Sequence, residues 1–465
     1  MERRALQDLQ RWQARPHRKP LLLRGARQVG KTWLIKELGR RSFDRLVYVN
    51  FDESAAARDV FDQDLDVGRI LTALALLDGG GPIDPATTLI ALDEIQEAPR
   101  ALTALKYFAE RLPGGYVIGA GSLLGVAVHE GTSFPVGKVE FYDLHPLSFP
   151  EFCTAVGRGD LAEVITGTDL TPTVPLHTVY ADLLRWYYVV GGMPEAVASY
   201  VSSDDVREVR RIQVQLLDAY ERDFSKHAPP SQVPRLREVF TSLPSQLAKE
   251  NRKFVYGLIR SGARAREYET AMAWLNDAGL THSVRRITAP KLPVAAYEDP
   301  RAFKLFGLDV GLLGAAARLD PRVVVAGDQV FTEFKGALTE QYVLQQLVAI
   351  GDMDPHYWTA ETGTAEVDFV VVHGSTIVPI EAKAEVNTKA KSLRRYRDTY
   401  HPTLAVRTAM VPYGTEPGLL SLPLYALAAL PRLIDAEVDP APGLPFTSIG
   451  RSITSEEVAR LIEED

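Results

Sequence analysis

The stretch Leu21-Leu-Leu-Arg-Gly25-Ala-Arg-Gln-Val-Gly30-Lys31-Thr32 decides the fold of the first part of the chain. A short apolar run is followed by the pattern G-x-x-x-x-G-K-[ST] and then by a helix-like segment, 33–38, which is the context that a phosphate-binding loop requires. Glycines let backbone N–H groups turn toward phosphate oxygens, and the helix N-terminus adds the positive end of its dipole. The alternative, a glycine turn that arose by chance, would not need the strand, the lysine, the threonine and the helix together. The predicted phosphate-binding residues are Gly25, Ala26, Arg27, Gln28, Val29, Gly30, Lys31 and Thr32.

Two acidic residues complete this predicted site. The apolar run 88–92 ends in Asp93-Glu94, where the carboxyl end of a parallel strand would lie close to the phosphate-binding loop. Lys31 would supply charge to the β- and γ-phosphates, and Thr32 and Asp93 would hold Mg²⁺. Glu94 would polarise the attacking water, a role that favours hydrolysis of a triphosphate over phosphate transfer to a small molecule.

The remaining strand signals place this site on an α/β fold. Short uninterrupted apolar runs alternate with helix-like segments, a pattern typical of parallel strands covered on both faces. A polar side chain after the fourth run, in Gly121-Ser122, can sense the γ-phosphate, although a plain Gly-Ser turn explains the same residues. Ser122 is therefore a candidate catalytic residue. The four runs are 21–23, 46–49, 88–92 and 116–118.

Composition bounds the class of protein. The chain has 465 residues, of which 46% are hydrophobic and 24% charged, which indicates folded globular domains, roughly three of ~150 residues each. Cys153 is the only cysteine, so an internal disulfide and a cysteine-ligated zinc site are excluded. No apolar stretch reaches the ~20 residues needed to cross a bilayer, and no secretory signal is visible. A cytoplasmic protein with no membrane partner is expected.

A second constellation lies in the C-terminal part of the chain. Glu340, Asp368 and Glu381 could converge on a Mg²⁺ ion. Lys383 lies two residues from Glu381 on the same strand face, where it could orient water or offset charge during phosphodiester cleavage. A Glu-x-Lys sequence also occurs on the solvated edge of a strand, and that alternative stays open. The predicted elements are a helix at 333–350 and strands at 366–372 and 377–383.

Basic segments make the case for nucleic acid as a partner. The net charge of −8 argues against a globally basic protein, yet residues 233–266 hold eight Lys or Arg against two Glu. Residues 386–397 hold five Lys or Arg and no acid, directly after the predicted metal site. This second run could track a phosphate backbone, with a solvated helix face as the alternative.

The middle of the chain has the order of elements of a winged helix. Apolar residues recur at helical spacing from Arg264 to Leu280, with Gly279 as a stop, and 281–287 alternates like a strand. A winged helix binds DNA with a helix in the major groove, and it equally serves as a platform for docking proteins.

Together, these motifs resemble a group of prokaryotic AAA-type ATPases that carry an uncharacterised C-terminal domain. The resemblance covers nearly the whole chain. It implies an ATP- and Mg²⁺-binding core, a helical and winged-helix middle, and a C-terminal domain similar to PD-(D/E)xK restriction-endonuclease-like nucleases, whose pattern Asp368, Glu381 and Lys383 match in residue type. The landmarks that carry it lie at 25–32, 92–96, 121–124, 144–152, 191–195, 303–309 and 335–340.

The predicted fold is therefore α/β: a P-loop NTPase sheet of AAA type, a helical and winged-helix middle, and a C-terminal α/β restriction-endonuclease-like domain. Expected boundaries are 1–155 for the ATPase domain, 156–230 for a helical lid or linker, 231–325 for the winged-helix-like domain and 326–465 for the nuclease-like domain.

One position departs from the pattern of the group. Its members often carry Gly-Arg before the Leu-x-Pro-Leu-Ser-Phe segment, whereas this chain has Gly137-Lys138. The planar fork of an arginine finger stabilises transition-state charge in a way that lysine cannot copy. Lys138 therefore weakens the expectation of hydrolysis activated across a homo-oligomer. Another arginine could serve, or Lys138 is a solvated surface charge.

Two functions are compatible with the sequence. In the first, the chain binds and hydrolyses ATP with Mg²⁺, and its C-terminal domain binds or cleaves DNA. In the second, the chain is an ATP-driven conformational switch whose C-terminal domain is a catalytically silent scaffold for a protein partner. The salt dependence of DNA affinity separates the two.

Overall fold

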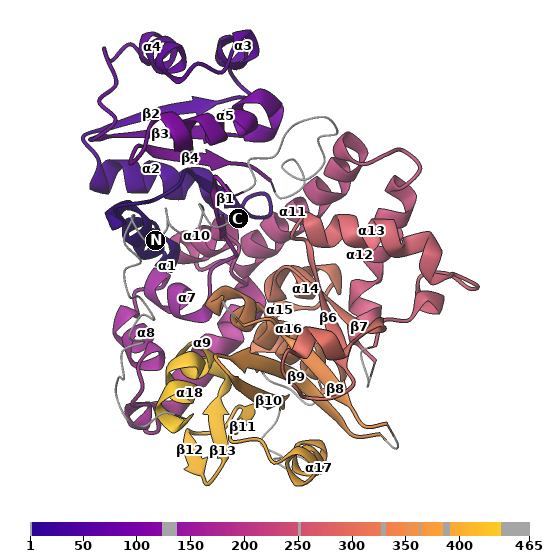
Figure 1. The fold of residues 1–465 in the computed structure, drawn as a ribbon. Helices are drawn as coiled ribbons and strands as arrows, with labels where there is room; N and C mark the ends of the chain where they lie inside the picture. Colours follow the sequence, from indigo (N-terminus) through magenta and orange to yellow (C-terminus); the bar gives the residue numbers. More distant parts are fainter. Residues whose placement is uncertain are drawn as a thin grey trace, which may run out of the picture.

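Two β-sheets organise the chain (Figure 1). The computed structural model describes residues 2–122, 137–249, 253–326, 332–351, 353–361, 364–384 and 391–438. The first sheet has five parallel strands in the order β2-β3-β4-β1-β5, and the second has eight strands in the order β12-β13-β11-β10-β9-β8-β6-β7.

The N-terminal sheet is covered by helices on both faces, which explains why its central strands are apolar without interruption. Successive residues of β3 alternate between two cores: Leu89 and Ala91 pack with α1 and α2, while Ile90 and Leu92 pack with α3, α4 and α5. The strands are β1 (Leu21–Arg24), β2 (Arg45–Asn50), β3 (Thr88–Asp93), β4 (Tyr116–Ala120) and β5 (Glu140–Asp143). The helices are α1 (Arg4–Ala14), α2 (Lys31–Ser42), α3 (Ala55–Gln63), α4 (Val67–Asp78) and α5 (Pro99–Arg111).

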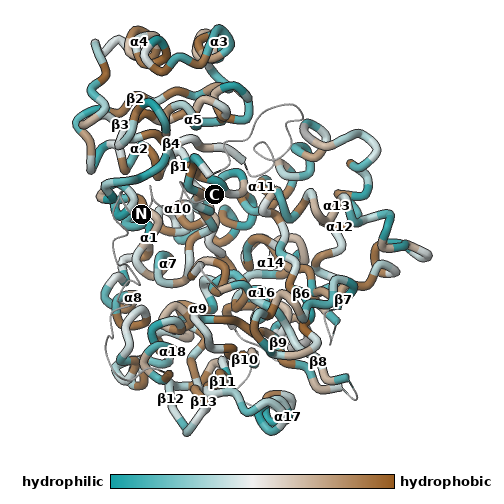
Figure 2. The backbone as a smooth tube through the Cα atoms, viewed as in Figure 1, coloured by the Kyte–Doolittle hydropathy of each residue, from teal (hydrophilic) through white to brown (hydrophobic). Residues whose placement is uncertain are grey.

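A helical region joins the two sheets and shares one core with both. The hydropathy of the chain follows this arrangement, with apolar residues along the strands and inner helices and a hydrophilic α17 (Lys391–Tyr400) at the periphery (Figure 2). The helices of the region between the two sheets are α7 (Phe149–Ala155), α8 (Gly159–Thr166), α9 (His177–Val190), α10 (Pro194–Ser203), α11 (Val206–His227), α12 (Val233–Leu247) and α13 (Ala265–Asp277).

The second sheet runs across the boundary expected at 325/326. Strands β6 (Thr281–Ile287) and β7 (Glu298–Gly307) form the antiparallel hairpin expected of the middle segment, but β6 also pairs in parallel with β8 (His356–Thr359). The hairpin therefore extends the C-terminal sheet and does not form a separate domain, because β6 pairs through its backbone with β8 as well as with β7. The other strands are β9 (Glu366–His373), β10 (Thr376–Ala382), β11 (Ala405–Ala409), β12 (Gly414–Glu416) and β13 (Leu419–Pro423).

Helix α16 (Thr332–Ile350) is the central helix of this half. Residues 337–347 are all buried, so the helix is surrounded by protein on every side. Its polar side chains bind backbone groups of neighbouring elements: Gln341 exchanges two hydrogen bonds with Gly307, at 2.8 and 2.7 Å, and Gln346 accepts one from the Phe149 amide at 2.8 Å. The remaining helices are α14 (Val310–Ala316), α15 (Pro321–Ala326), α17 and α18 (Leu430–Val438). None of the helices in the described ranges combines the length and apolar composition of a bilayer-spanning segment.

Candidate nucleotide site and C-terminal acidic cavity

The phosphate-binding loop lies between β1 and α2, as the motif predicts. Gly25 passes so close to the next segment that an added Cβ would lie 2.4 Å from the Leu144 carbonyl oxygen. The Lys31 ammonium donates to the carbonyl oxygens of Gly25 and Ala26 at 3.0 and 2.9 Å. Burial lowers the pKa of Lys31 to about 8, while the charges of Glu94 and Asp93 act in the opposite direction.

Asp93, at the end of β3, is the centre of a small polar cluster beside this loop. The hydroxyls of Thr32 and Tyr48 both donate to Asp93 Oδ2 at 2.7 Å, and the Glu94 amide donates to Asp93 Oδ1 at 3.0 Å. A carboxylate and a hydroxyl are hard oxygen ligands of the kind that Mg²⁺ takes alongside phosphate, so the residues present fit this ion. Tyr48 carried no signal in the sequence, since only the pairing of β2 with β3 brings it here.

Glu94 follows Asp93 with a left-handed backbone, φ +51°. This conformation is uncommon for a residue other than glycine and is concentrated at functional positions. The Gln96 amide donates to the Glu94 carboxylate, which fixes the side chain next to the strand end. The structure thus brings Lys31, Thr32, Asp93 and Glu94 to one edge of the sheet.

Ser122 lies two residues beyond the end of β4, which separates β1 from β3. This position is between the loop and the acidic pair, as a γ-phosphate sensor requires, and the sensor role stays a prediction. The rest of the 121–124 landmark is outside the described residues. Lys138 forms an exposed ion pair with Glu110 at 3.0 Å, which is the contact expected of a surface charge.

Arg3 contacts the loop backbone from outside the motif, and Arg27, within the motif, reaches helix α11. Arg3 is 6% exposed and donates to the carbonyl oxygens of Val29 and His145 at 3.2 and 2.7 Å, while it pairs with Glu151 at 3.0 Å. Arg27 forms an ion pair with Asp223 of α11. The Arg3 contact depends on how α1 packs beside the loop, and the sequence motif does not indicate that packing.

A buried polar junction connects this domain to the second sheet. The Asp309 carboxylate, 1% exposed, accepts hydrogen bonds from the amides of Gly192 and Leu312, at 2.6 and 3.0 Å, and from the Gln345 side chain at 2.8 Å. Burial raises the pKa of Asp309, and these donors oppose that shift. Gly192 in turn accepts from the Leu147 amide at 2.7 Å, and an added Cβ on Gly192 would lie 2.1 Å from the Leu147 oxygen.

The predicted C-terminal site residues line one cavity of about 740 Å³. Glu340 comes from α16, Glu366 and Asp368 come from β9, and Glu381 comes from β10. The antiparallel pairing of β9 with β10 brings Asp368 next to this strand, and its Oδ2 accepts from the Ala382 amide at 2.9 Å. Burial and the Glu340 charge raise the pKa of Asp368.

Lys383 lies just beyond β10, since the strand ends at Ala382 rather than at 383 as expected. Its ammonium pairs with Glu381 Oε1 at 2.8 Å and remains at the cavity wall. Glu381 Oε2 is buried without a hydrogen-bond partner in the described structure. This oxygen is a ligand atom without a donor, as a metal site would require.

Lys304, from β7, is a member of this site that the sequence did not indicate. Its side chain is fully buried, and its ammonium lies 2.7 Å from Glu366 Oε1, 3.3 Å from Glu340 Oε2 and 4.0 Å from Asp368 Oδ1. Burial alone would lower the pKa of Lys304, but these three carboxylates together raise it. The expected convergence of Glu340 and Asp368 therefore occurs around a lysine from the hairpin.

A tighter group of metal-binding residue types lies elsewhere in the sheet. Within the described ranges, ligand atoms of Glu298, Asp354 and His356 lie within 4.8 Å of one another. Glu298 Oε1 is 2.8 Å from His356 Nε2, and Glu298 Oε2 pairs with Arg285 at 2.7 Å. Because both oxygens of Glu298 have partners within the protein, this group links β6, β7 and β8 as a structural clamp.

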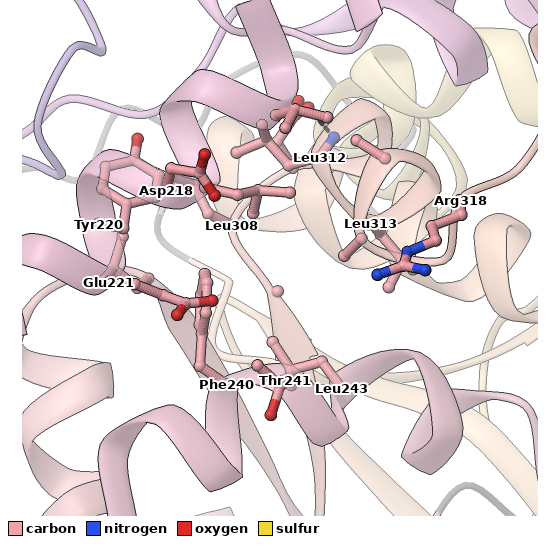
Figure 3. A pocket seen from close by; sticks show the side chains of 17 residues that line it. Asp218, Tyr220, Glu221, Phe240, Thr241, Leu243, Leu308, Leu312, Leu313 and Arg318 are labelled. Carbon is pink, nitrogen blue, oxygen red and sulfur yellow. Dashed lines mark hydrogen bonds between the residues drawn. The ribbon is translucent and has the colours of Figure 1, made fainter. Parts of the chain in front are cut away.

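Another cavity, of about 400 Å³, lies between α11, α12 and α14 (Figure 3). Leu308, Leu312 and Leu313 line it on one side, and Asp218 and Glu221 of α11 face them. The lining also includes Asp309 and Arg318, and most of its other residues are apolar.

Comparison with known families matches the AAA domain family to residues 17–153. Residues 17–153 form a P-loop AAA-type ATPase domain. This match confirms the predicted α/β fold with a parallel sheet and the predicted class of ATPase. Two domain families of unknown function match further parts of the chain, DUF8612 at 181–323 and DUF4143 at 335–425. No curated protein matches the sequence.

Solved structures resemble the chain only distantly. The Walker-type ATPase of Pyrococcus abyssi is 13% identical with a TM-score of 0.44, covering 68% of this chain and 95% of the other. Cdc6p from Pyrobaculum aerophilum is 14% identical with a TM-score of 0.24, covering 70% and 93%. Drosophila ORC bound to DNA is 14% identical with a TM-score of 0.28, covering 68% and 95%. At these scores the similarities do not assign a function.

Proposed function

We propose that the protein hydrolyses ATP with Mg²⁺ at its N-terminal site and that its C-terminal cavity cleaves DNA with a divalent metal ion. The observation that carries the first half is the meeting of Lys31, Thr32, Asp93 and Glu94 at one sheet edge. The second half rests on the acidic cavity with Lys383 at its wall.

The N-terminal residues divide the work of hydrolysis between them. Lys31 leaves the carbonyl oxygens of Gly25 and Ala26 and turns to the β- and γ-phosphates. Thr32 and Asp93 hold the magnesium ion, which when bound neutralises charge on the triphosphate. Glu94 takes the proton of the attacking water, and Ser122 contacts the γ-phosphate. Arg3 and Tyr48 are positioning residues, because they hold the loop backbone and Asp93.

The Lys31→Ala variant should lose ATP binding. The variant lacks the ammonium that contacts the phosphates. We therefore expect the Kd for MgATP to rise by ~10-fold to 100-fold, which corresponds to the loss of one or two charge-assisted hydrogen bonds. Isothermal titration calorimetry measures this change. Arg40→Ala is the matched control, because Arg40 is an exposed cation on the same helix and pairs with Glu37. Equal affinity of Lys31→Ala and wild type would contradict the site.

The C-terminal cavity combines metal ligands with groups that suit a phosphodiester. Asp368 and Glu381 supply carboxylate oxygens, while Lys383 and Lys249 add positive charge at its wall. Helix α17 begins beside the cavity, where the Glu366 amide donates to Ser392 Oγ at 3.2 Å, and its exposed Lys391 and Arg394 extend the basic surface. Lys389, in the same basic run, is outside the described residues. In this proposal α12, α13 and the β6–β7 hairpin present DNA to the cavity in the manner of a winged helix, while the hairpin stays part of the C-terminal sheet.

Purified protein should cut plasmid DNA in the presence of Mg²⁺ or Mn²⁺. We expect Asp368→Ala and Lys383→Ala to reduce cleavage at least ~100-fold, since one loses a metal ligand and the other the charge at the reacting phosphate. Gel analysis of supercoiled and single-stranded DNA, with and without ATP, measures cleavage. Asp398→Ala, an exposed acid on α17, is the control. Absence of cleavage under every metal and nucleotide condition would remove this half of the proposal.

The buried polar junction favours a second candidate function. Asp309 and Gln345 connect Gly192 to α16, so an ATP-driven change could alter the C-terminal half without any cleavage. The chain would then be a conformational switch with a silent C-terminal scaffold for a protein partner. This candidate predicts slow turnover, tight nucleotide retention and no salt-dependent DNA binding, and a salt titration of DNA affinity distinguishes it from the first. A homo-oligomer remains part of either proposal, with no arginine finger assigned.

A further inference from the structure

A buried cation, Lys304, lies directly behind the lining of the acidic cavity. Glu340, Glu366, Asp368 and Glu381 all contribute to its lining. Lys304 stands behind that lining with no exposed side-chain surface, and its ammonium is within ion-pair distance of three of the four acids. The Tyr357 ring, 5.1 Å away, covers another side of the ammonium.

Lys304 reaches this position from outside the elements that carry the acids. It belongs to β7, one of the two edge strands of the eight-stranded sheet, and it pairs with Val284 of β6. A lysine fixed in this way cannot leave unless the hairpin moves, because its side chain is enclosed by the sheet and by α16.

Charge in the cavity is only partly balanced by the lysines. Four carboxylates face three ammonium groups, Lys304, Lys383 and Lys249, so the formal charge of this group is −1. The ammonium of Lys383 contacts Glu381 Oε1, and Glu381 Oε2 has no hydrogen-bond partner among the described residues. The unpartnered oxygen therefore lies on the Asp368–Glu381 side, whereas the shortest contact of Lys304 is with Glu366.

We propose that Lys304 is a built-in cation that occupies one cation position of the cavity and so lowers by one the number of divalent ions that the cavity binds. Two-metal phosphodiester sites place two divalent ions ~4 Å apart to stabilise both the attacking and the leaving oxygen. Lys304 takes the inner of two such positions, between Glu340 and Glu366, and leaves the outer one, on Asp368 and Glu381, for a single ion. This inference rests on the proposed metal site of the cavity and deepens it.

Counting bound Mn²⁺ in the Lys304→Gln variant tests the inference. Both the parent and the variant are the full chain, nucleotide-free and carrying Asp93→Asn so that the N-terminal site adds no ion. We expect Lys304→Gln to bind one more Mn²⁺ than the parent, measured from the free-ion signal in electron paramagnetic resonance. Arg301→Gln, which removes an exposed positive charge from the same strand, should gain none. An unchanged count in folded Lys304→Gln overturns the inference.

Thermal unfolding provides a second readout if Lys304→Gln is unstable. Removing the ammonium leaves buried carboxylates without a counter-charge, so in EDTA the Tm should fall by at least ~5 °C and Ca²⁺ should restore most of that loss. The double variant Lys304→Gln/Glu366→Gln, in which the lost charges cancel, should recover stability without Ca²⁺. A Tm loss that Ca²⁺ does not reverse, in a single variant that the double variant does not rescue, also overturns the inference.

Failure of the proposed function gives a different result. If the parent binds no Mn²⁺ and cuts no DNA while Lys304→Gln gains one ion, the nuclease proposal falls and the role of Lys304 stands. If the parent binds one ion and cuts DNA while Lys304→Gln gains none, the nuclease proposal stands and the role of Lys304 falls.

Discussion

The Glu94→Gln variant should hydrolyse ATP ~100-fold to 1,000-fold more slowly than wild type while binding ATP with an affinity within a few-fold of it. Glutamine keeps the size of the side chain and its contact with Gln96, but it cannot accept the proton of the attacking water. Asp93 and Thr32 are untouched, so the magnesium position is preserved. Phosphate release under saturating MgATP gives the rate, and calorimetry gives the affinity.

A nearby acid provides the control for this prediction. Glu97 lies three residues further along, at the end of the short helix Ile95–Glu97, and Glu97→Gln makes the same chemical change away from the phosphate-binding loop. We expect Glu97→Gln to keep at least half of the wild-type rate. A Glu94→Gln protein that turns over ATP at the wild-type rate would show that another group activates the water.

The Asp309→Ala variant should lose ~3–5 kcal/mol of stability, the cost of breaking a buried charged network from one side. Truncation leaves the amides of Gly192 and Leu312 and the side chain of Gln345 without their acceptor inside the protein. It also opens a void against Gly191, where the carboxylate fills the space of a missing Cβ. The Tm should fall by roughly 10 °C, measured by differential scanning calorimetry.

Two further variants separate this network from a general effect of charge. Asp309→Asn keeps an acceptor oxygen and should lose less than half as much as Asp309→Ala. Asp320→Ala removes an exposed aspartate that pairs with Arg322 and should change the Tm by less than ~2 °C. If Asp309→Ala melts within 2 °C of wild type, the junction does not stabilise the fold.

The N-terminal site could be predicted because its parts are short, local and physically demanding. Gly25 and Lys31 belong to one loop, and Asp93 follows an apolar run that can only be a buried strand. Tyr48 and Arg3 could not be predicted, since their contacts depend on which strands are neighbours and where the first helix packs. A single sequence specifies each strand but not the order of strands in the sheet.

The C-terminal site was predicted in part for the same reason. Asp368 and Glu381 lie on the two strands of a hairpin and Lys383 directly follows the second strand, so their spacing along the chain indicates proximity. Lys304 lies 64 positions before Asp368 and enters through a hairpin that was expected to belong to another domain. The 303–309 landmark contained both Lys304 and Asp309, but its residues gave no sign that one faces the acids and the other faces Gly192.

Helix α16 has a consequence for how this protein can change over evolutionary time. Glu340 at the acidic cavity and Gln345 at the junction are five residues apart on one rigid rod, a separation of ~7.5 Å along its axis. Pro194, two residues from Gly192, lies against the phosphate-binding loop, where an added Cβ on Gly30 would be 3.6 Å from its ring. A mutation that moves α16 to improve the contacts of Glu340 also moves Gln345. The acidic cavity and the junction are therefore constrained to change together.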